Sequence, residues 1–193
     1  MSGLKIAIIL GSTRPGRKGK VVADWVVDQA KNRDGATYEL VDLADYPLPH
    51  LDEPQPASRG VYSGEHTKEW AAKIDSYDGF VFVTPEYNHS TSGVLKNAID
   101  YLYAEWNNKA AAFVSYGALG GTRAAEHLRG ISAELQIADI RQQLSFSLIT
   151  DFENFSEFRP AAYHDQMAKA LFDQLEAWTG ALKPLRLGRV HAS

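Results

Sequence analysis

Residues 4–20, LKIAIILGSTRPGRKGK, join an apolar run to a loop rich in glycine, hydroxyl groups and positive charge. The apolar run Leu4–Leu10 is typical of a strand that is buried on both faces. Beyond the loop, Val22 and Val26 lie on one face of a predicted helix, Lys18–Ala30. The stretch therefore predicts a strand, a turn and a helix, the repeating unit of an α/β fold.

The loop Gly11–Lys20 has the composition of an anion-binding site. Its glycines let the backbone approach a ligand closely, and Ser12 and Thr13 offer hydroxyl groups. Four positive charges follow within residues 14–20 of a net acidic chain. Of these, Arg14 is the first, whereas the others lie on the helix side and are expected to point into water. A helix start adds free N–H groups and the positive end of a dipole, so we expect the anion to be a phosphate.

Three kinds of phosphate loop compete with an ordinary solvated basic turn. A Walker loop is disfavoured, because Arg17 follows Gly16 and the hydroxyl that binds Mg²⁺ is missing. A dinucleotide loop needs G-x-G-x-x-G, which is absent, although Asp42 could imitate the acid that binds ribose. The hydroxyl-rich loop of flavodoxin-like proteins, which grips a terminal phosphate, suits Ser12 and Arg14.

The bulk composition is that of an ordinary globular protein. The chain has 193 residues, of which 45% are hydrophobic and 23% charged, and a net charge of −4. We place one domain at residues 1–180 and a loose tail at residues 181–193.

Positive charge gathers near the first loop, which argues against nucleic-acid binding. Without cysteine, redox chemistry requires a bound cofactor. The N-terminal apolar run is too short for a signal peptide or membrane span, so we expect a cytoplasmic protein.

Apolar strands and amphipathic helices alternate along the rest of the chain. Further strands are predicted at residues 37–43, 79–83, 110–114 and within 138–146. Helices are predicted at residues 65–76, from about 92, through 124–135 and from 160. This alternation predicts a five-stranded parallel sheet with helices on both faces. Two topologies are common for such a sheet, and the one that we adopt is the flavodoxin-like three-layer α/β sandwich of order 2-1-3-4-5. In that order the ligand lies at the carboxyl ends of strands 1 and 3.

The loops after the third and fourth strands carry polar, aromatic and glycine residues. The third strand runs into TPEYNHS, residues 84–90, where Tyr87 can form an aromatic wall and Asn88 can supply an amide. The fourth strand runs into SYGALGG, residues 115–121, whose glycines allow a planar ring to approach. Each loop alone could be an ordinary turn. Three such loops at one edge of the sheet indicate a flavin site.

The chain resembles the NAD(P)H-dependent FMN reductase family over about residues 4–144. The motifs that carry the resemblance are GSTRPGRKGK, TPEYNHSTSGVLKNAIDYL and SYGALGGTRAAEHLR. The resemblance implies a flavodoxin-like fold, noncovalently bound FMN and a homodimer or homotetramer. It also implies phosphate contacts from Ser12, Arg14, Lys20 and Val21. The residues that it implies around the flavin ring and ribityl chain are Pro85, Glu86, Tyr87, Asn88, Ser115, Gly117 and Gly120.

We therefore expect an oxidoreductase that passes hydride from NAD(P)H through FMN to a small-molecule acceptor, such as free flavin, a quinone, an azo dye or chromate. No side chain is assigned as a catalytic acid or base, because the flavin does the chemistry. No metal is expected, since the histidines are not spaced with carboxylates as in a metal site, and only His89 lies in the candidate site. A flavodoxin-type electron carrier, which binds FMN without oxidising NAD(P)H, is the alternative.

The aromatic residues outside the loops are assigned by their spacing. Three tryptophans on helix stripes are expected in the core: Trp25, Trp70 and Trp178. Three residues near the end of the third helix are expected in a dimer interface: Tyr101, Tyr103 and Trp106. For Trp106, a pocket wall is the alternative. Two alternatives, covering a partner's site or plugging the domain's own edge, stay open for three residues of one loop: Phe152, Phe155 and Phe158.

Overall fold

A parallel sheet forms the centre of the computed structural model, which describes residues 3–188. Its strands are β1 (Leu4–Leu10), β2 (Ala36–Asp42), β3 (Gly79–Pro85), β4 (Ala110–Gly117) and β5 (Ala138–Ser147). The five strands run in the order β2-β1-β3-β4-β5, and every neighbouring pair is parallel. This order confirms the predicted flavodoxin-like topology.

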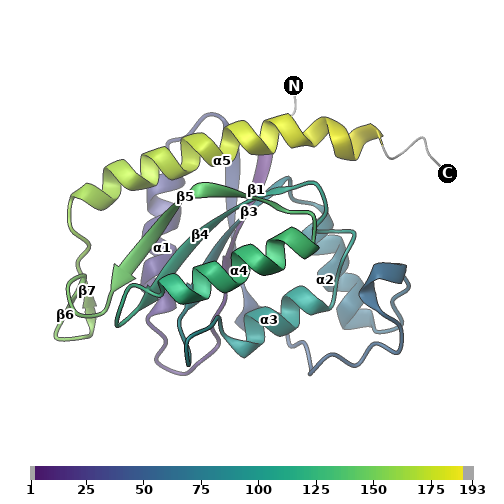
Figure 1. The fold of residues 1–193 in the computed structure, drawn as a ribbon, viewed down its shortest axis with the longest axis horizontal. Coiled ribbons are helices and arrows are strands. Elements are labelled where there is room, and N and C mark those ends of the chain that lie inside the picture. The colour runs from purple at the N-terminus through teal and green to yellow at the C-terminus, as the bar shows by residue number, and fades with distance from the viewer. Residues whose placement is uncertain (1–2, 189–193) are drawn as a thin grey trace.

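Helices cover both faces of the sheet (Figure 1). One face packs against α1 (Gly19–Ala30) and α5 (Tyr163–Leu187). The other face packs against α2 (Glu65–Asp75), α3 (Gly93–Asp100) and α4 (Thr122–Glu134). The long segment between β2 and α2 contains two short 3₁₀ turns, η1 (Leu43–Asp45) and η2 (Ala57–Arg59).

The central strands are largely apolar because both of their faces are buried. In β1, Ile6 and Ile8 pack into the cluster beneath α1 and α5, while Ala7 and Ile9 pack into the cluster on the opposite face. A parallel sheet that is covered on both sides needs such continuous apolar runs. The same pattern runs through β3 and β4, in which every residue is buried.

The C-terminal helix continues past the predicted domain end at residue 180. Helix α5 runs to Leu187, so the expectation of a loose tail is wrong for residues 181–187, and residues 189–193 lie outside the described part. The last turns are held by Asp78, whose carboxylate lies 2.9 Å from Lys183 Nζ and 2.5 Å from Arg186 Nη2. These two ion pairs hold the end of α5 against the sheet beyond Gly180, the predicted end of the domain.

The aromatic residues after α3 turn inward. Tyr101 and Trp106 are fully buried, and the indole N–H of Trp106 donates to the carbonyl of Ile99. The expectation that these two residues form a dimer interface is therefore wrong. The chain folds back after α3, and both rings enter the core that contains Trp70.

On the helix stripes, Trp70 is buried as predicted, and Trp25 is half-buried against Phe146. Trp178 is 43% exposed, so its assignment to the core is wrong. The buried stripe of α5 passes through Thr179 instead, which packs closely against Gly79 at the start of β3.

The acidic, aromatic loop after β5 contains a small hairpin, β6 (Phe152–Glu153) paired with β7 (Glu157–Phe158). Phe152 and Phe158 pack together and against the core, and Phe158 contacts the rings of Trp25 and Phe146. Phe155, at the tip, is 64% exposed. Of the two open alternatives, Phe152 and Phe158 therefore plug the domain's own edge.

Candidate functional site

The three predicted loops meet around a cavity of about 240 Å³ at the carboxyl edge of the sheet. Residues 14–18 follow β1, residues 85–87 follow β3, residues 116–117 end β4, and Leu148 adds a wall after β5. Strands β1 and β3 are neighbours whose helices lie on opposite faces, so the cavity occupies the switch point of the sheet.

Only some of the residues that were predicted to contact the phosphate can do so through their side chains. Ser12 is buried, and its hydroxyl lies 3.0 Å from the phenol oxygen of Tyr87. Arg14 lines the cavity, and no acceptor in residues 3–188 pairs with its guanidinium. Lys20 and Val21 are exposed, and Lys20 forms an ion pair with Asp24. Lys20 and Val21 can therefore serve an anion through the backbone N–H groups of the first turn of α1.

Arg17 does not point into water, and that expectation is wrong. Its guanidinium forms a two-point ion pair with Asp42, with Nη1 2.7 Å from Oδ1, and also donates to the carbonyl of Ser12. The same carboxylate accepts from the backbone N–H of Ala44 and caps η1. Arg17 thus pulls the first loop onto the end of β2. Its charge is paired, which leaves Arg14 as the unpaired guanidinium beside the cavity.

The second loop is a tight turn that positions Tyr87. The backbone N–H and carbonyl groups of Tyr87 and Ser90 bond to each other at 2.9 and 3.2 Å. Between them, Asn88 and His89 have φ angles of 50° and 75°, and both side chains are exposed. Asparagine and histidine are both enriched among the non-glycine residues that adopt positive φ, so this sequence suits a tight turn at the rim of the cavity.

Glu86 joins the second loop to the third. Its carboxylate accepts from Arg123 Nη1 at 2.7 Å and from the backbone N–H of Arg123 at 3.2 Å. Gly121, at the N-cap of α4, has no side chain with which to cap the helix, so Glu86 caps it from the neighbouring loop. The carboxylate is committed to this role, and Glu86 lines the cavity beside Pro85.

The third loop depends on glycine for a sharp turn. Gly120 and Gly121 have φ angles of 77° and 70°, and a Cβ atom at position 121 would lie 2.7 Å from the backbone nitrogen of Tyr116. The fully buried hydroxyl of Ser115 donates to the carbonyl of Gly120 at 2.8 Å. Ser115 and Gly120 therefore shape the turn, while Gly117 lines the cavity itself.

A larger cleft of about 1120 Å³ adjoins this cavity, and Arg14 and Tyr87 line both. Its far walls are residues 43–50 and α3. The sequence analysis assigned no part of the site to residues 43–50 and missed this wall.

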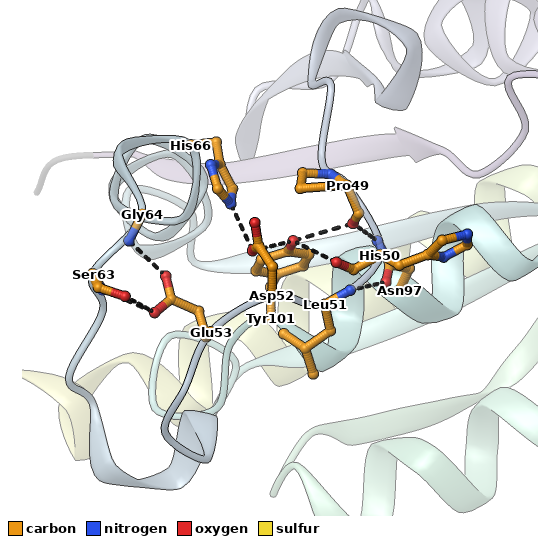
Figure 2. A network of polar contacts seen from close by, with 10 residues as sticks. All are labelled: Pro49, His50, Leu51, Asp52, Glu53, Ser63, Gly64, His66, Asn97 and Tyr101. Atoms are coloured by element: carbon orange, nitrogen blue, oxygen red, sulfur yellow. Dashed lines mark hydrogen bonds and ion pairs between the residues drawn. The ribbon is translucent and has the colours of Figure 1, made fainter.

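Figure 2 shows how α3 holds the far wall of the cleft. The Asn97 amide donates to the carbonyl of Pro49 at 2.7 Å and accepts from the N–H of Leu51 at 3.0 Å. The Tyr101 hydroxyl reaches Asp52 at 2.9 Å, and hydrogen bonds from Tyr101 and His66 lower the pKa of the Asp52 carboxyl group. The signal that could have revealed this wall was the spacing of Asn97 and Tyr101, which puts both on one face of a helix.

Two further properties concern the described part of the chain alone. Residues 3–188 contain no group of three or more histidine and acidic side chains that could hold a metal ion. In the same range, no helix is long and apolar enough to cross a membrane.

The residues around the smaller cavity fit a flavin mononucleotide. Helix α1 starts without a side-chain cap, so its first N–H groups are available to a phosphate beside the free charge of Arg14. Tyr87 supplies an aromatic wall. At Gly117, a Cβ atom would come within 3.3 Å of Glu86 Cβ, so glycine keeps the floor of the cavity flat enough for a planar ring.

Known proteins resemble this chain in sequence and in fold. Residues 4–151 match the family model described as NADPH-dependent FMN reductase. An NAD(P)H-dependent FMN reductase of Schizosaccharomyces pombe is 46% identical over 135 residues, which cover 69% of this chain and 68% of that protein. A 2-hydroxy-1,4-benzoquinone reductase of a Burkholderia species is 34% identical over 146 residues, 72% of this chain and 75% of that protein. The structure of FerB, a flavoenzyme NAD(P)H:(acceptor) oxidoreductase from Paracoccus denitrificans, superposes with a TM-score of 0.71 at 20% identity, covering 92% and 98% of the two chains.

The fold and the three-loop site define a flavodoxin-like flavoprotein. The chain belongs to the NADPH-dependent FMN reductase family, as its loops predicted. It is an oxidoreductase with FMN as its cofactor and NAD(P)H as its co-substrate.

Proposed function

We propose that this enzyme uses NADPH or NADH to reduce quinones. When bound, FMN would supply the redox chemistry, hydride transfer from the nicotinamide and electron transfer to the acceptor. Arg14 would hold its phosphate, and the second and third loops would hold the ring with one side open to reactants. Free flavin, azo dyes and chromate are further candidate acceptors.

The observation that carries this proposal is the cleft that shares Arg14 and Tyr87 with the smaller cavity. Its apolar lining suits a flat, hydrophobic acceptor next to the flavin: Leu43, Tyr46, Leu48 and Val94. Two relatives named for quinones support this choice, the Burkholderia enzyme and an NAD(P)H:quinone oxidoreductase of Solanum tuberosum, which is 36% identical over 139 residues. A Bacillus protein named NADPH azoreductase, 32% identical, supports the azo-dye alternative.

Absorption spectroscopy of the FMN-loaded protein tests this function. The yellow protein should bleach when NADPH or NADH is added without oxygen, and a quinone should restore the colour. Steady-state rates with a benzoquinone, free FMN, an azo dye and chromate then rank the acceptors, and kcat/KM should be highest for the benzoquinone. A yellow protein that stays oxidised in excess NADPH and NADH would instead be an electron carrier.

We also propose that the enzyme is a homodimer in solution. Three exposed apolar side chains follow consecutive strands at the edge that bears the site: Leu119, Ile149 and Phe155. Pairing of two copies would bury them and cover the flavin ring. Light scattering at micromolar concentration should give twice the mass of the chain or, for a homotetramer, four times that mass; a monomer contradicts the proposal. The cytoplasmic location stays a prediction that cell fractionation would test.

A further inference from the structure

Tyr116, in β4, carries a buried hydroxyl group without a hydrogen-bond partner in the described part of the chain. The side chain is only 5% exposed, yet the residue lines the smaller cavity. A buried hydroxyl that bonds to nothing destabilises a folded protein, so such groups are rare without a reason. A ligand that enters the cavity could supply the missing partner.

The hydroxyl points at the start of α1. A Cβ atom at Gly19, the first residue of this helix, would lie 2.4 Å from Tyr116 Oη, closer than non-bonded atoms approach. Tyr116 therefore fills the space that a side chain at position 19 would occupy. It places a hydroxyl group from β4 beside the first turn of the helix.

Two of the cations near this helix start are paired with carboxylates, and two are unpaired within residues 3–188. Lys18, at the N-cap, makes no side-chain cap, so the N–H groups of the first turn keep their partial positive charge. Arg17 is bound to Asp42 and Lys20 to Asp24. The remaining positive donors around the cavity are Arg14 and Lys18, which both line it without an ion pair in residues 3–188, and the backbone N–H groups.

We propose that Tyr116 Oη donates a hydrogen bond to the terminal phosphate of FMN, as a ligand supplied by β4 across from the N-terminus of α1. The inference rests on the proposed FMN function and assigns one further residue to that site. Burial raises the pKa of the Tyr116 phenol, with a further contribution from Tyr87, so the group stays protonated and can donate to a phosphate oxygen. Riboflavin, which lacks the phosphate, would not use this contact.

The test compares Tyr116→Phe with the wild-type protein. The apoprotein is titrated with FMN and with riboflavin, and binding is followed by flavin fluorescence. We expect the Kd for FMN to rise about tenfold to a hundredfold, the range for a hydrogen bond to a charged group, while the Kd for riboflavin is unchanged. The melting temperature of the apoprotein should not fall, because the variant removes an unpaired hydroxyl rather than a bond.

Tyr77→Phe is the matched control. Tyr77 also carries a buried hydroxyl without a partner in residues 3–188, but it lies between α2 and β3, beyond the three loops of the site. This variant should leave the Kd for both flavins unchanged, which separates the phosphate contact from a general effect of removing a buried hydroxyl.

Two results would overturn the inference. One is an unchanged Kd for FMN in Tyr116→Phe when the wild-type protein binds FMN. The other is an equal loss of FMN and riboflavin binding with a lower melting temperature, which would make Tyr116 a structural residue. A wild-type protein that binds neither flavin would instead refute the proposed function, and the inference with it.

Discussion

The hydroxyl of Ser12 lies 3.0 Å from the phenol oxygen of Tyr87, and this contact joins the loop after β1 to the loop after β3. It crosses the switch point of the sheet, where open parallel sheets bind their ligands. Tyr87 lines both the smaller cavity and the larger cleft. The contact therefore holds in place the aromatic wall that separates the proposed flavin site from the proposed acceptor site.

Tyr87→Phe should weaken the binding of FMN and of riboflavin by the same factor. Loss of one neutral hydrogen bond costs about 1 kcal/mol, or roughly fivefold in affinity, and it loosens the ring rather than the phosphate contact. Fluorescence titration with the two flavins measures this. Tyr103→Phe, which loses a contact to Gln136 at the other end of α3, serves as a control. A loss confined to FMN would show that Tyr87 acts on the phosphate instead.

Arg14→Ala should weaken FMN binding and spare riboflavin. A charge-assisted hydrogen bond contributes about 1.5–3 kcal/mol, which corresponds to about a tenfold to hundredfold change in Kd. Lys20→Ala should have a smaller effect, since that ammonium group is paired with Asp24. Arg17→Ala should lower the binding of both flavins and the melting temperature, because Arg17 supports the loop through Asp42. Unchanged FMN binding in Arg14→Ala would place the phosphate elsewhere.

The enzyme should follow ping-pong kinetics. The open side of the flavin site adjoins one cleft, so NADPH must leave before the acceptor binds. Initial rates measured over a range of NADPH at several fixed quinone concentrations should give parallel double-reciprocal lines. Lines that intersect would indicate a ternary complex, for which this site would need room for both reactants at once.

Asp78→Asn should destabilise the protein by loosening the end of α5. The carboxylate is bound by Lys183, Arg186 and the backbone N–H of Lys5. Loss of charge-assisted bonds of this kind costs about 2–3 kcal/mol, which urea denaturation at pH 7 would detect. Asp34→Asn, at an exposed site, should change the unfolding free energy by less than about 0.5 kcal/mol.

The effect of Asp78→Asn on stability should also depend on pH. Burial raises the pKa of Asp78, but the bonds from Lys183, Lys5 and Arg186 outweigh burial and lower the pKa below the usual value of 3.8. A carboxyl group whose pKa is lowered on folding contributes stability above its unfolded pKa and loses it as pH falls through the folded pKa. The stability difference between wild type and Asp78→Asn should therefore be full at pH 7 and shrink below about pH 4. A difference independent of pH would show that the charge of Asp78 is not the cause.

The sequence by itself predicted a covered parallel sheet and a candidate site at its carboxyl edge. Short apolar runs such as Leu4–Leu10 are typical of strands covered on both sides, and their alternation with helices leaves few topologies. Parallel strands then bring their following loops to one edge. Ser12, Arg14, Tyr87 and Gly117 could be grouped for this reason, although about 105 residues separate the first from the last.

Only the tertiary structure decided what each polar or aromatic side chain contacts. Glu86, predicted beside the flavin, lines the cavity and also caps α4 beside Arg123, whereas Arg17 was expected in water but binds Asp42. Trp106 looked like an interface residue but lies in the core. Local periodicity reports which face of an element is apolar. The partner of a charged group or of a ring beyond a helix end lies on another element, and packing alone brings the two together.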